Sequence, residues 1–185
     1  MSSYRKAEFD VAKVRRLLEP GPVVLVTSRF RKQRNIMTLG WHTVLEFSPS
    51  LVGCMISSAN HSFQLIRNSK ECVINVPERH LARTVVDIGN CSGRDGDKFE
   101  KFGLSDQTAE TVSAPVIKEC YAHLECKLYD GALIRKYNFF IFEVVRAYAA
   151  VKPKHPKTIH YRGNGAFMIS GEPLNLKSRF APDKL

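Results

Sequence analysis

The sequence has no apolar run long enough to cross a lipid bilayer. Its uninterrupted apolar stretches fall far short of the ~20 residues that a membrane-spanning helix needs. The first ten residues, MSSYRKAEFD, also lack the apolar core of a secretory signal peptide. We therefore expect no membrane partner and a cytoplasmic location.

Paired cysteines are missing as well. The five cysteines are odd in number and include no C-x-x-C pair, which argues against both a disulfide framework and a zinc ribbon. Cys120 and Cys126 instead alternate with Ala122, Leu124 and Leu128, as small buried apolar residues do. We expect reduced thiols in a reducing compartment and no metal site.

Acidic residues are scarce beside basic ones. The 28 lysines and arginines against 18 acidic residues give a net charge of +10, which raises nucleic acid as a partner. The charge is dispersed, however, and no aromatic interleaving or recognition helix accompanies it. The densest cluster, RFRKQR at 29–34, is interpreted first as a solvated connection between strands and second as a rim that attracts a phosphorylated ligand. We expect no nucleic-acid partner, although a non-enzymatic anion-binding or nucleic-acid-binding module stays open as an alternative.

What is present is the pattern of one globular domain over residues 1–185, with 44% apolar and 25% charged residues. A short helix should begin after Asp10 and end at Pro20–Gly21. Short β-branched runs bounded by Gly, Pro, Asn and Ser predict strands. They lie at 22–28, 41–47, 51–57, 72–76, 119–128 and 137–151.

Two of these strands carry further information. The run 137–151 is apolar on both faces and should be central in a sheet. In the run 119–128, Tyr121, His123, Glu125 and Lys127 share the face opposite the cysteines. We expect that face to be wet or shared with a partner.

Helical spacing appears between the early and late strands. Leu81, Val85 and Ile88 fall at i, i+4 and i+7 before Gly89, and a shorter helix from Asp95 should end before Gly103. Strands and helices do not alternate regularly, so we predict a mainly β fold with helices (α+β), built as an antiparallel barrel rather than a parallel doubly wound sheet. The tail, 171–185, should be extended and reach another subunit.

The run ISSANHSF at 56–63 separates a predicted strand from a segment with helical spacing. If Asn60 or a neighbouring serine caps that helix, its first backbone N–H groups and the positive end of its dipole are surrounded by polar donors. The run is therefore either an ordinary capped helix start or a phosphate site. No G-x-G-x-x-G or Walker motif strengthens the second interpretation.

The run NIMTLGWHT at 35–43 is a second candidate. Asn35, Thr38, Gly40 and the only tryptophan, Trp41, cluster where a hairpin should meet a strand, and a glycine there permits close approach of a planar ligand. Trp41 can equally belong to the core, since it alternates with Thr43, Leu45 and Phe47.

The run NCSGRDGDKFEKFGL at 90–104 is the third. Lys98 should lie in the first turn of its helix, where the dipole disfavours a cation by about 0.3 to 1 kcal/mol. Asp95 and Asp97 can offset that cost. Lys98 therefore either has no role in ligand binding, next to a carboxylate cluster at the helix start, or points at an electron-rich ligand. An anion loop, a planar-ring edge and a positioned lysine on one barrel would suit a phosphorylated heteroaromatic cofactor.

These three runs, with PGPVVLVTS before them and ECVINVP between them, resemble the flavin reductase-like family, close to flavoredoxins, over residues 18–170. The resemblance implies a Greek-key split β-barrel that binds FMN and forms a homodimer, with FMN near the subunit interface. It implies an oxidoreductase that passes electrons from NAD(P)H or a redox partner through FMN to an acceptor. The alternative is an FMN-binding electron carrier of the flavoredoxin type that does not react with NAD(P)H directly.

The resemblance also implies roles for individual residues. Asn35, Met37, Thr38 and Trp41 match the segment that lines the isoalloxazine ring. The ribityl-phosphate loop is matched by Ser57, Ser58, Asn60, His61 and Ser62, and Lys98 matches a lysine that approaches the flavin. Tyr137 is expected to face the ring from the partner subunit, and Phe167 to close over it. No side-chain acid or base is expected, because hydride transfer takes place at flavin N5.

Overall fold

A computed structural model describes residues 3–181 of the chain. Its main feature is an eight-stranded antiparallel sheet with the order β3-β2-β6-β9-β10-β5-β4, to which β1 adds by pairing with β10. The strands of this sheet are β1 (Lys6–Glu8), β2 (Val24–Phe30), β3 (Gln33–Leu39), β4 (His42–Glu46), β5 (Leu51–Met55), β6 (Glu71–Val76), β9 (Ala122–Asp130) and β10 (Phe139–Ala150). Two small hairpins complete the set: β7 (Asp106–Gln107) with β8 (Val116–Ile117), and β11 (Ile159–Gly163) with β12 (Ala166–Ile169).

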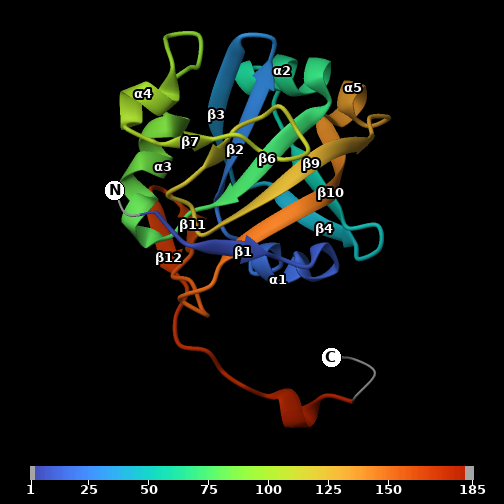
Figure 1. Cartoon of the computed structure of the whole chain (residues 1–185), viewed down its shortest axis with the longest axis vertical. Coiled ribbons are helices and arrows are strands. Elements are labelled where there is room, and N and C mark those ends of the chain that lie inside the picture. Colours follow the sequence, from blue (N-terminus) through green and yellow to red (C-terminus); the bar gives the residue numbers. More distant parts are fainter. Residues whose placement is uncertain (1–2, 182–185) are drawn as a thin grey trace.

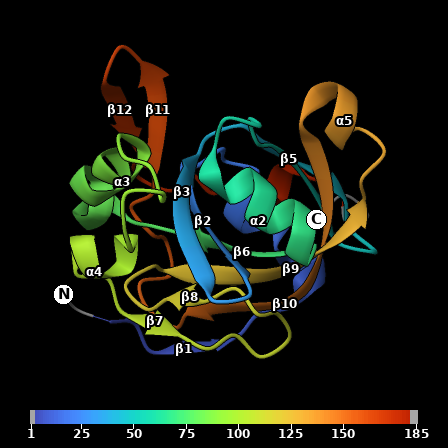
Figure 2. The same cartoon turned by 90° about the horizontal axis from the view of Figure 1, so that it is seen from above.

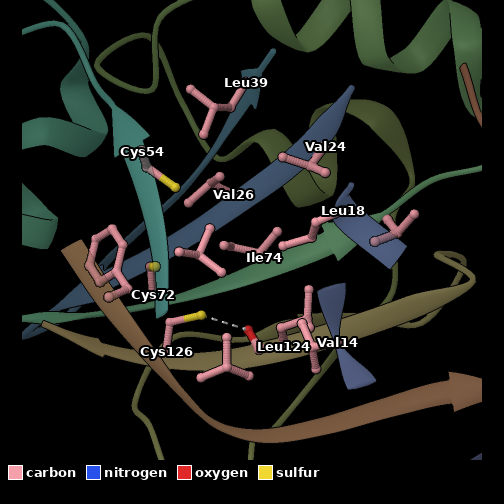
Figure 3. Close-up of a cluster of buried hydrophobic side chains, with 14 of the residues drawn as sticks. Val14, Leu18, Val24, Val26, Leu39, Cys54, Cys72, Ile74, Leu124 and Cys126 are labelled. Atoms are coloured by element: carbon pink, nitrogen blue, oxygen red, sulfur yellow. Dashed lines mark hydrogen bonds between the residues drawn. The ribbon is translucent and has the colours of Figure 1, made fainter. Parts of the chain in front are cut away.

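The sheet curls around one apolar core but is not closed by hydrogen bonds, because β3 and β4 are not paired with each other. Figure 3 shows side chains from β2, β5, β6 and β9 meeting inside this open barrel, with Cys54, Cys72 and Cys126 among them. The prediction of a mainly β fold with helices and an antiparallel barrel is confirmed. The central position of β10, paired with β5, β9 and β1, is confirmed too.

Helices cover two sides of the barrel (Figures 1 and 2). They are α1 (Arg15–Leu18), α2 (His61–Ser69), α3 (Ala82–Gly89), α4 (Lys98–Phe102) and α5 (Ile134–Tyr137), with 3-10 turns at Val11–Lys13, Arg79–Leu81 and Lys177–Arg179. α2 directs Phe63 and Ile66 into the barrel core. α3 and α4 cover a second core on the outside of β2 and β3, which includes Leu25 and Ile36. None of the described helices is long and apolar enough to span a bilayer.

The basic cluster at 29–34 differs from its predicted place in a loop. β2 continues to Phe30 and β3 begins at Gln33, so only Arg31 and Lys32 occupy the turn. Arg31 has a positive φ of 56°, which allows the chain to reverse within two residues. Arg34 lies within β3 and forms ion pairs with Asp97 and Asp106, so this arginine is not a solvated loop residue.

Trp41 is not part of the core. Its side chain is 69% exposed, and Leu45 and Phe47 on the same strand face are exposed as well. Because β4 is an edge strand of the open sheet, the described residues leave most of this face open; Arg15 lies over the Phe47 ring, 5.0 Å from its centroid, but does not bury it.

The face of β9 that carries Tyr121, His123 and Glu125 is buried, so the prediction of a wet or shared face is wrong for these three residues. Lys127 alone is exposed. The covering segment, residues 105–118, includes β7 and β8 and lies across this part of the sheet (Figure 1). It packs Val112, Ala114 and Val116 against Val73 of β6.

Residues 171–181 of the C-terminal tail form no helix or strand apart from one 3-10 turn. Figure 1 shows it leading away from the barrel. Residues 182–185 lie outside the described residues. Contact of the tail with another subunit stays a prediction.

Candidate functional site

The loop that precedes α2 presents an uncapped helix N-terminus. Asn60 occupies the N-cap position with extended φ and ψ of −69° and 137°, but no side chain of the described residues caps the helix. The Oγ of Ser57 accepts from the backbone N–H of Ala59 at 3.3 Å, which tightens the loop. The N–H of Phe63 donates to the carbonyl of Asn60 at 3.1 Å, which leaves the N–H groups of His61 and Ser62, together with the helix dipole, available to an anion.

A cationic pocket adjoins this N-terminus. It has a volume of about 380 Å³ and is formed by the β2–β3 turn, the first residue of α2 and the loop before α4; its lining residues are Lys32, Gln33, Arg34, His61, Gly93, Arg94, Gly96 and Asp97. The pKa of His61 is lowered, first by burial and then by the positive charges of Arg94 and Lys98. A bound anion would offset that repulsion.

Not every cation in this pocket is equally available. Arg34 donates from Nε to Asp97 at 2.7 Å and from Nη1 to Asp106 at 2.6 Å, so its charge is balanced. Lys32 and Arg94 form no ion pair among the described residues. The unmatched positive charge therefore comes from Arg94 and Lys32, next to the start of α2.

A buried hydrogen-bond network supports the floor between α2 and β3. Asn35 Nδ2 donates to Ser62 Oγ at 2.9 Å, and Ser28 Oγ donates to the same oxygen at 3.2 Å. Asn35 Oδ1 is buried and has no donor among the described residues, although a buried amide oxygen normally has one. Gly93 packs directly on this amide, which leaves an acceptor close to the cationic pocket.

A second depression, the aromatic cleft, has a volume of about 580 Å³ and lies between α3 and the β11–β12 hairpin. Figure 2 shows that hairpin standing beside α3. Its lining residues are Gly21, Val23, Thr38, Gly40, Trp41, Val85, Val86, Gly89, Asn90, Tyr161, Gly165 and Phe167. The rings of Tyr161 and Phe167 lie 5.1 Å apart, and Thr38 Oγ1 donates to the carbonyl of Val85 at 2.6 Å, which fixes α3 against β3.

The cationic pocket and the aromatic cleft are neighbours along β3. Arg34 lines the first and Thr38 the second, and four residues of strand span about 13 Å at ~3.3 Å per residue. The chain from Asn90 to Arg94 runs alongside, with its first residue in the cleft and its last in the pocket. The arrangement suits a ligand that has a planar ring at one end and an anionic group at the other.

The structure places most of the predicted site residues around these two depressions. Thr38, Trp41 and Phe167 line the cleft, His61 lines the pocket, and Asn35 and Ser62 lie between α2 and β3. Ser57, Ser58 and Asn60 form the loop before α2, with Ser58 and Asn60 exposed. The Ser62 oxygen accepts from Asn35 and Ser28, and Ser62 is fully buried, so this serine positions Asn35.

Three predicted residues lie elsewhere. Met37 points into the barrel core, where it is buried. Lys98 opens α4 and is buried too; its Nζ donates to the carbonyl of Ile88 at 2.8 Å, and burial lowers its pKa. Tyr137 is exposed and ends α5, which lies on the opposite side of the barrel from α3 and the β11–β12 hairpin (Figure 2). A role for Tyr137 is therefore open only across a subunit interface.

Sequence reasoning missed Arg94, Tyr161 and the face of α3 that lines the cleft. Arg94 stood inside the motif SGRD, but nothing in the sequence shows that this loop meets the start of α2. Tyr161 belongs to a hairpin that Asn164–Gly165 signals, since both residues have positive φ as a type I′ turn requires. The sequence therefore contained a signal from which this hairpin could have been predicted.

Replacing Gly93 by alanine should destabilise the fold by about 1 to 3 kcal/mol, since a Cβ there would lie 2.2 Å from Asn35 Oδ1 and force the buried amide to move. Urea denaturation measures the loss. Gly40→Ala is the matched control, because no atom lies within 4 Å of its Cβ position and its φ is ordinary. Equal stabilities for the two variants would show that Gly93 does not constrain Asn35.

Comparison with known proteins gives a consistent result. The sequence matches the model of the flavin reductase like domain over residues 15–167. The Escherichia coli K12 protein YddH, which is uncharacterized, is 30% identical over 171 residues, covering 85% of this chain and 90% of YddH.

Two solved structures extend the comparison. The FMN-binding domain of a flavin reductase-like enzyme from Shewanella baltica superposes with a TM-score of 0.87 at 27% identity, covering 95% of this chain and 99% of that one. The flavoredoxin of Desulfovibrio vulgaris (Miyazaki F) gives a TM-score of 0.77 at 23% identity over 84% and 89% of the two chains. The second likeness is one of fold.

Proposed function

Because the chain belongs to the flavin reductase-like family, we propose that it binds FMN and passes electrons through the bound flavin to an acceptor. The family model covers most of the chain, and the structure from Shewanella baltica is of an FMN-binding domain. The resemblance recognised in the sequence is thereby confirmed. These comparisons also support FMN as the cofactor.

The observation that carries the residue assignment is the adjacency of the aromatic cleft and the cationic pocket along β3. FMN has a flat tricyclic ring and a phosphate, joined by a polyhydroxylated five-carbon chain. The ring then occupies the cleft, and the phosphate occupies the pocket. Asn35 Oδ1, which has no donor among the described residues, suits a hydroxyl of the connecting chain.

At the phosphate end, the uncapped N-terminus of α2, His61 and Arg94 bind the anion. Charge-assisted hydrogen bonds of this kind contribute about 1.5 to 3 kcal/mol each. Ser57, Ser58 and Asn60 shape the loop that presents the backbone N–H groups. Lys98, at the start of α4, adds positive electrostatic potential at the phosphate end, since its charge already lowers the pKa of His61.

At the ring end, Trp41 and Phe167 form apolar walls, and Thr38 holds α3 in place through Val85. Met37 supports this part of β3 from the barrel side. Bound FMN supplies reversible electron acceptance and donation at its ring. The protein therefore has to orient the ring, keep one face open to a reactant and set the electrostatic environment.

A homodimer is the second element of the proposal. Trp41, Leu45 and Phe47, on β4 and at its two ends, form an exposed apolar strip whose Trp41 end lines the cleft, and isolated monomers seldom expose large apolar patches without a partner. A second copy on this strip places FMN near the interface and offers Tyr137 as a residue from the partner subunit. Sedimentation equilibrium should give twice the chain mass, and Phe47→Glu should shift it toward the monomer.

The electron donor is either NAD(P)H or a reduced redox protein. An anaerobic visible spectrum of the FMN-loaded protein separates the two. Bleaching on addition of NADH or NADPH supports a nicotinamide-dependent reductase and identifies the preferred donor. A flavin spectrum that stays oxidised with both, but bleaches with dithionite, supports an electron carrier served by a protein. Failure to retain FMN at all contradicts the proposal.

A further inference from the structure

A third depression lies on the outer face of the barrel and shares no lining residue with the aromatic cleft or the cationic pocket. This outer-face pocket has a volume of about 310 Å³, at the small end of the range for ligand sites. Its floor is β9 and β10, with His123 and Tyr148; one wall is β1 with Lys6, and the other is the covering segment with Lys118. Nothing in the proposed flavin chemistry uses it.

The two carboxylates of the outer-face pocket are already satisfied by the protein. Glu125 is fully buried and accepts from the backbone N–H of Glu110 at 3.0 Å, and from the N–H and hydroxyl of Thr111 at 2.6 Å each. Glu110 pairs with Arg146 at 2.8 Å and accepts from the Tyr148 hydroxyl. Neither acid needs a cation from a ligand.

The two lysines are not satisfied in the same way. Lys6 Nζ has a single long hydrogen bond, to the carbonyl of Ile117 at 3.3 Å, and neither Lys6 nor Lys118 forms an ion pair among residues 3–181. Lys6 is half-buried, and burial lowers its pKa although the charges of nearby groups such as Glu119 oppose this. An anion beside Lys6 would recover the solvation that burial removes.

His123 provides the second polar feature. Its side chain is only 5% exposed, its ring stacks on that of Tyr148 with centroids 5.1 Å apart, and its Nδ1 has no hydrogen-bond partner among the described residues. Burial, and then the charge of Lys6, lower its pKa to about 3. The imidazole is therefore neutral at pH 7 and can donate one hydrogen bond and accept another.

We propose that the outer-face pocket binds a small monocarboxylate that carries a hydroxyl group. The carboxylate pairs with Lys6 and Lys118, and the hydroxyl is recognised by His123. A dianion is disfavoured because Glu110 and Glu125 lie in the same walls. The small volume excludes a nucleotide.

NMR of the imidazole groups in the full-length protein tests this inference, with glycerate, glycerol and inorganic phosphate as the probes. Glycerate should shift the His123 signals in a saturable manner, and glycerol should not. Lys6→Met with Lys118→Met should weaken glycerate binding by about tenfold or more. Lys154→Met, which removes an exposed lysine outside the pocket, should leave it unchanged.

The single variant Lys118→Met is the control in case the double variant does not fold. Because Lys118 is exposed, its replacement should leave the fold intact, and it should also weaken glycerate binding. The inference is overturned if the His123 signals do not respond to glycerate, if glycerol binds as well, if phosphate binds more tightly, or if the lysine variants keep full affinity. None of these outcomes depends on whether FMN is bound.

Discussion

Changing Arg94 to glutamate lowers the affinity for FMN by about 100-fold, the largest effect expected of any single exposed residue. The change removes a charge-assisted hydrogen bond to phosphate and adds a repulsive charge, which together amount to about 2 to 3 kcal/mol at low ionic strength. Quenching of flavin fluorescence on binding measures the dissociation constant. Because Arg94 has no ion pair among the described residues, little of the loss should come from disrupted structure.

Arg67→Glu is the matched control for this variant. Arg67 lies on the same helix as His61 but near its C-terminal end, where it is exposed, and the substitution changes the net charge equally. If both variants lose affinity to the same extent, the effect is one of overall charge, and the assignment of the phosphate to the cationic pocket is wrong.

Replacing Glu125 by alanine should cost about 3 kcal/mol or more of folding free energy, because three donors in the covering segment lose a buried charged acceptor. The backbone N–H groups of Glu110 and Thr111 and the Thr111 hydroxyl would have no partner at that position. Urea denaturation followed by circular dichroism gives the value. Amide exchange should accelerate first in residues 105–118, since Glu125 fastens that segment to β9.

Glu71→Ala is the comparison. Glu71 accepts from the N–H and hydroxyl of Ser113, so it fastens the same segment, but at an exposed position. Its loss should cost about 1 kcal/mol, because water replaces the missing acceptor. A Glu125 variant that is no less stable than the Glu71 variant would show that the buried carboxylate does not hold the covering segment.

The fold was predictable wherever periodicity and burial agree. The apolar runs of β6 and β10 predicted both strands directly. The spacing of Leu81, Val85 and Ile88, which are all buried, predicted the helix that contains α3. β3 was missed because its sequence, QRNIMTL, mixes polar and apolar residues: Asn35 faces α2, Ile36 faces the second core and Met37 faces the barrel. Such a strand carries no simple alternation.

The covering segment was beyond local reasoning. Tyr121, His123 and Glu125 look like a solvent-facing row, and only the long-range bonds from residues 110 and 111 to Glu125 show otherwise. For Trp41 the error was the reverse: a core position was considered, but the side chain is exposed. An apolar residue beside an edge strand resembles a core residue until the strand order is known.

The candidate site shows the same division. The loop before α2 and the segment from Asn35 to Trp41 could be recognised from motifs, and the structure places both beside the cationic pocket and the aromatic cleft. Arg94 and Tyr161 could not be recognised from motifs. They line the cationic pocket and the aromatic cleft only because the 90–97 loop and the β11–β12 hairpin fold beside β3. Lys98 was recognised, but its burial against Ile88 was not.

The most direct test of the account compares the binding of FMN with that of riboflavin, which has the same ring and lacks the phosphate. If the cationic pocket holds the phosphate, FMN binds at least about 100-fold more tightly than riboflavin, corresponding to two or more charge-assisted hydrogen bonds. In Arg94→Glu that advantage should disappear while riboflavin affinity stays the same. Equal affinities of the unaltered protein for FMN and riboflavin would contradict the central claim.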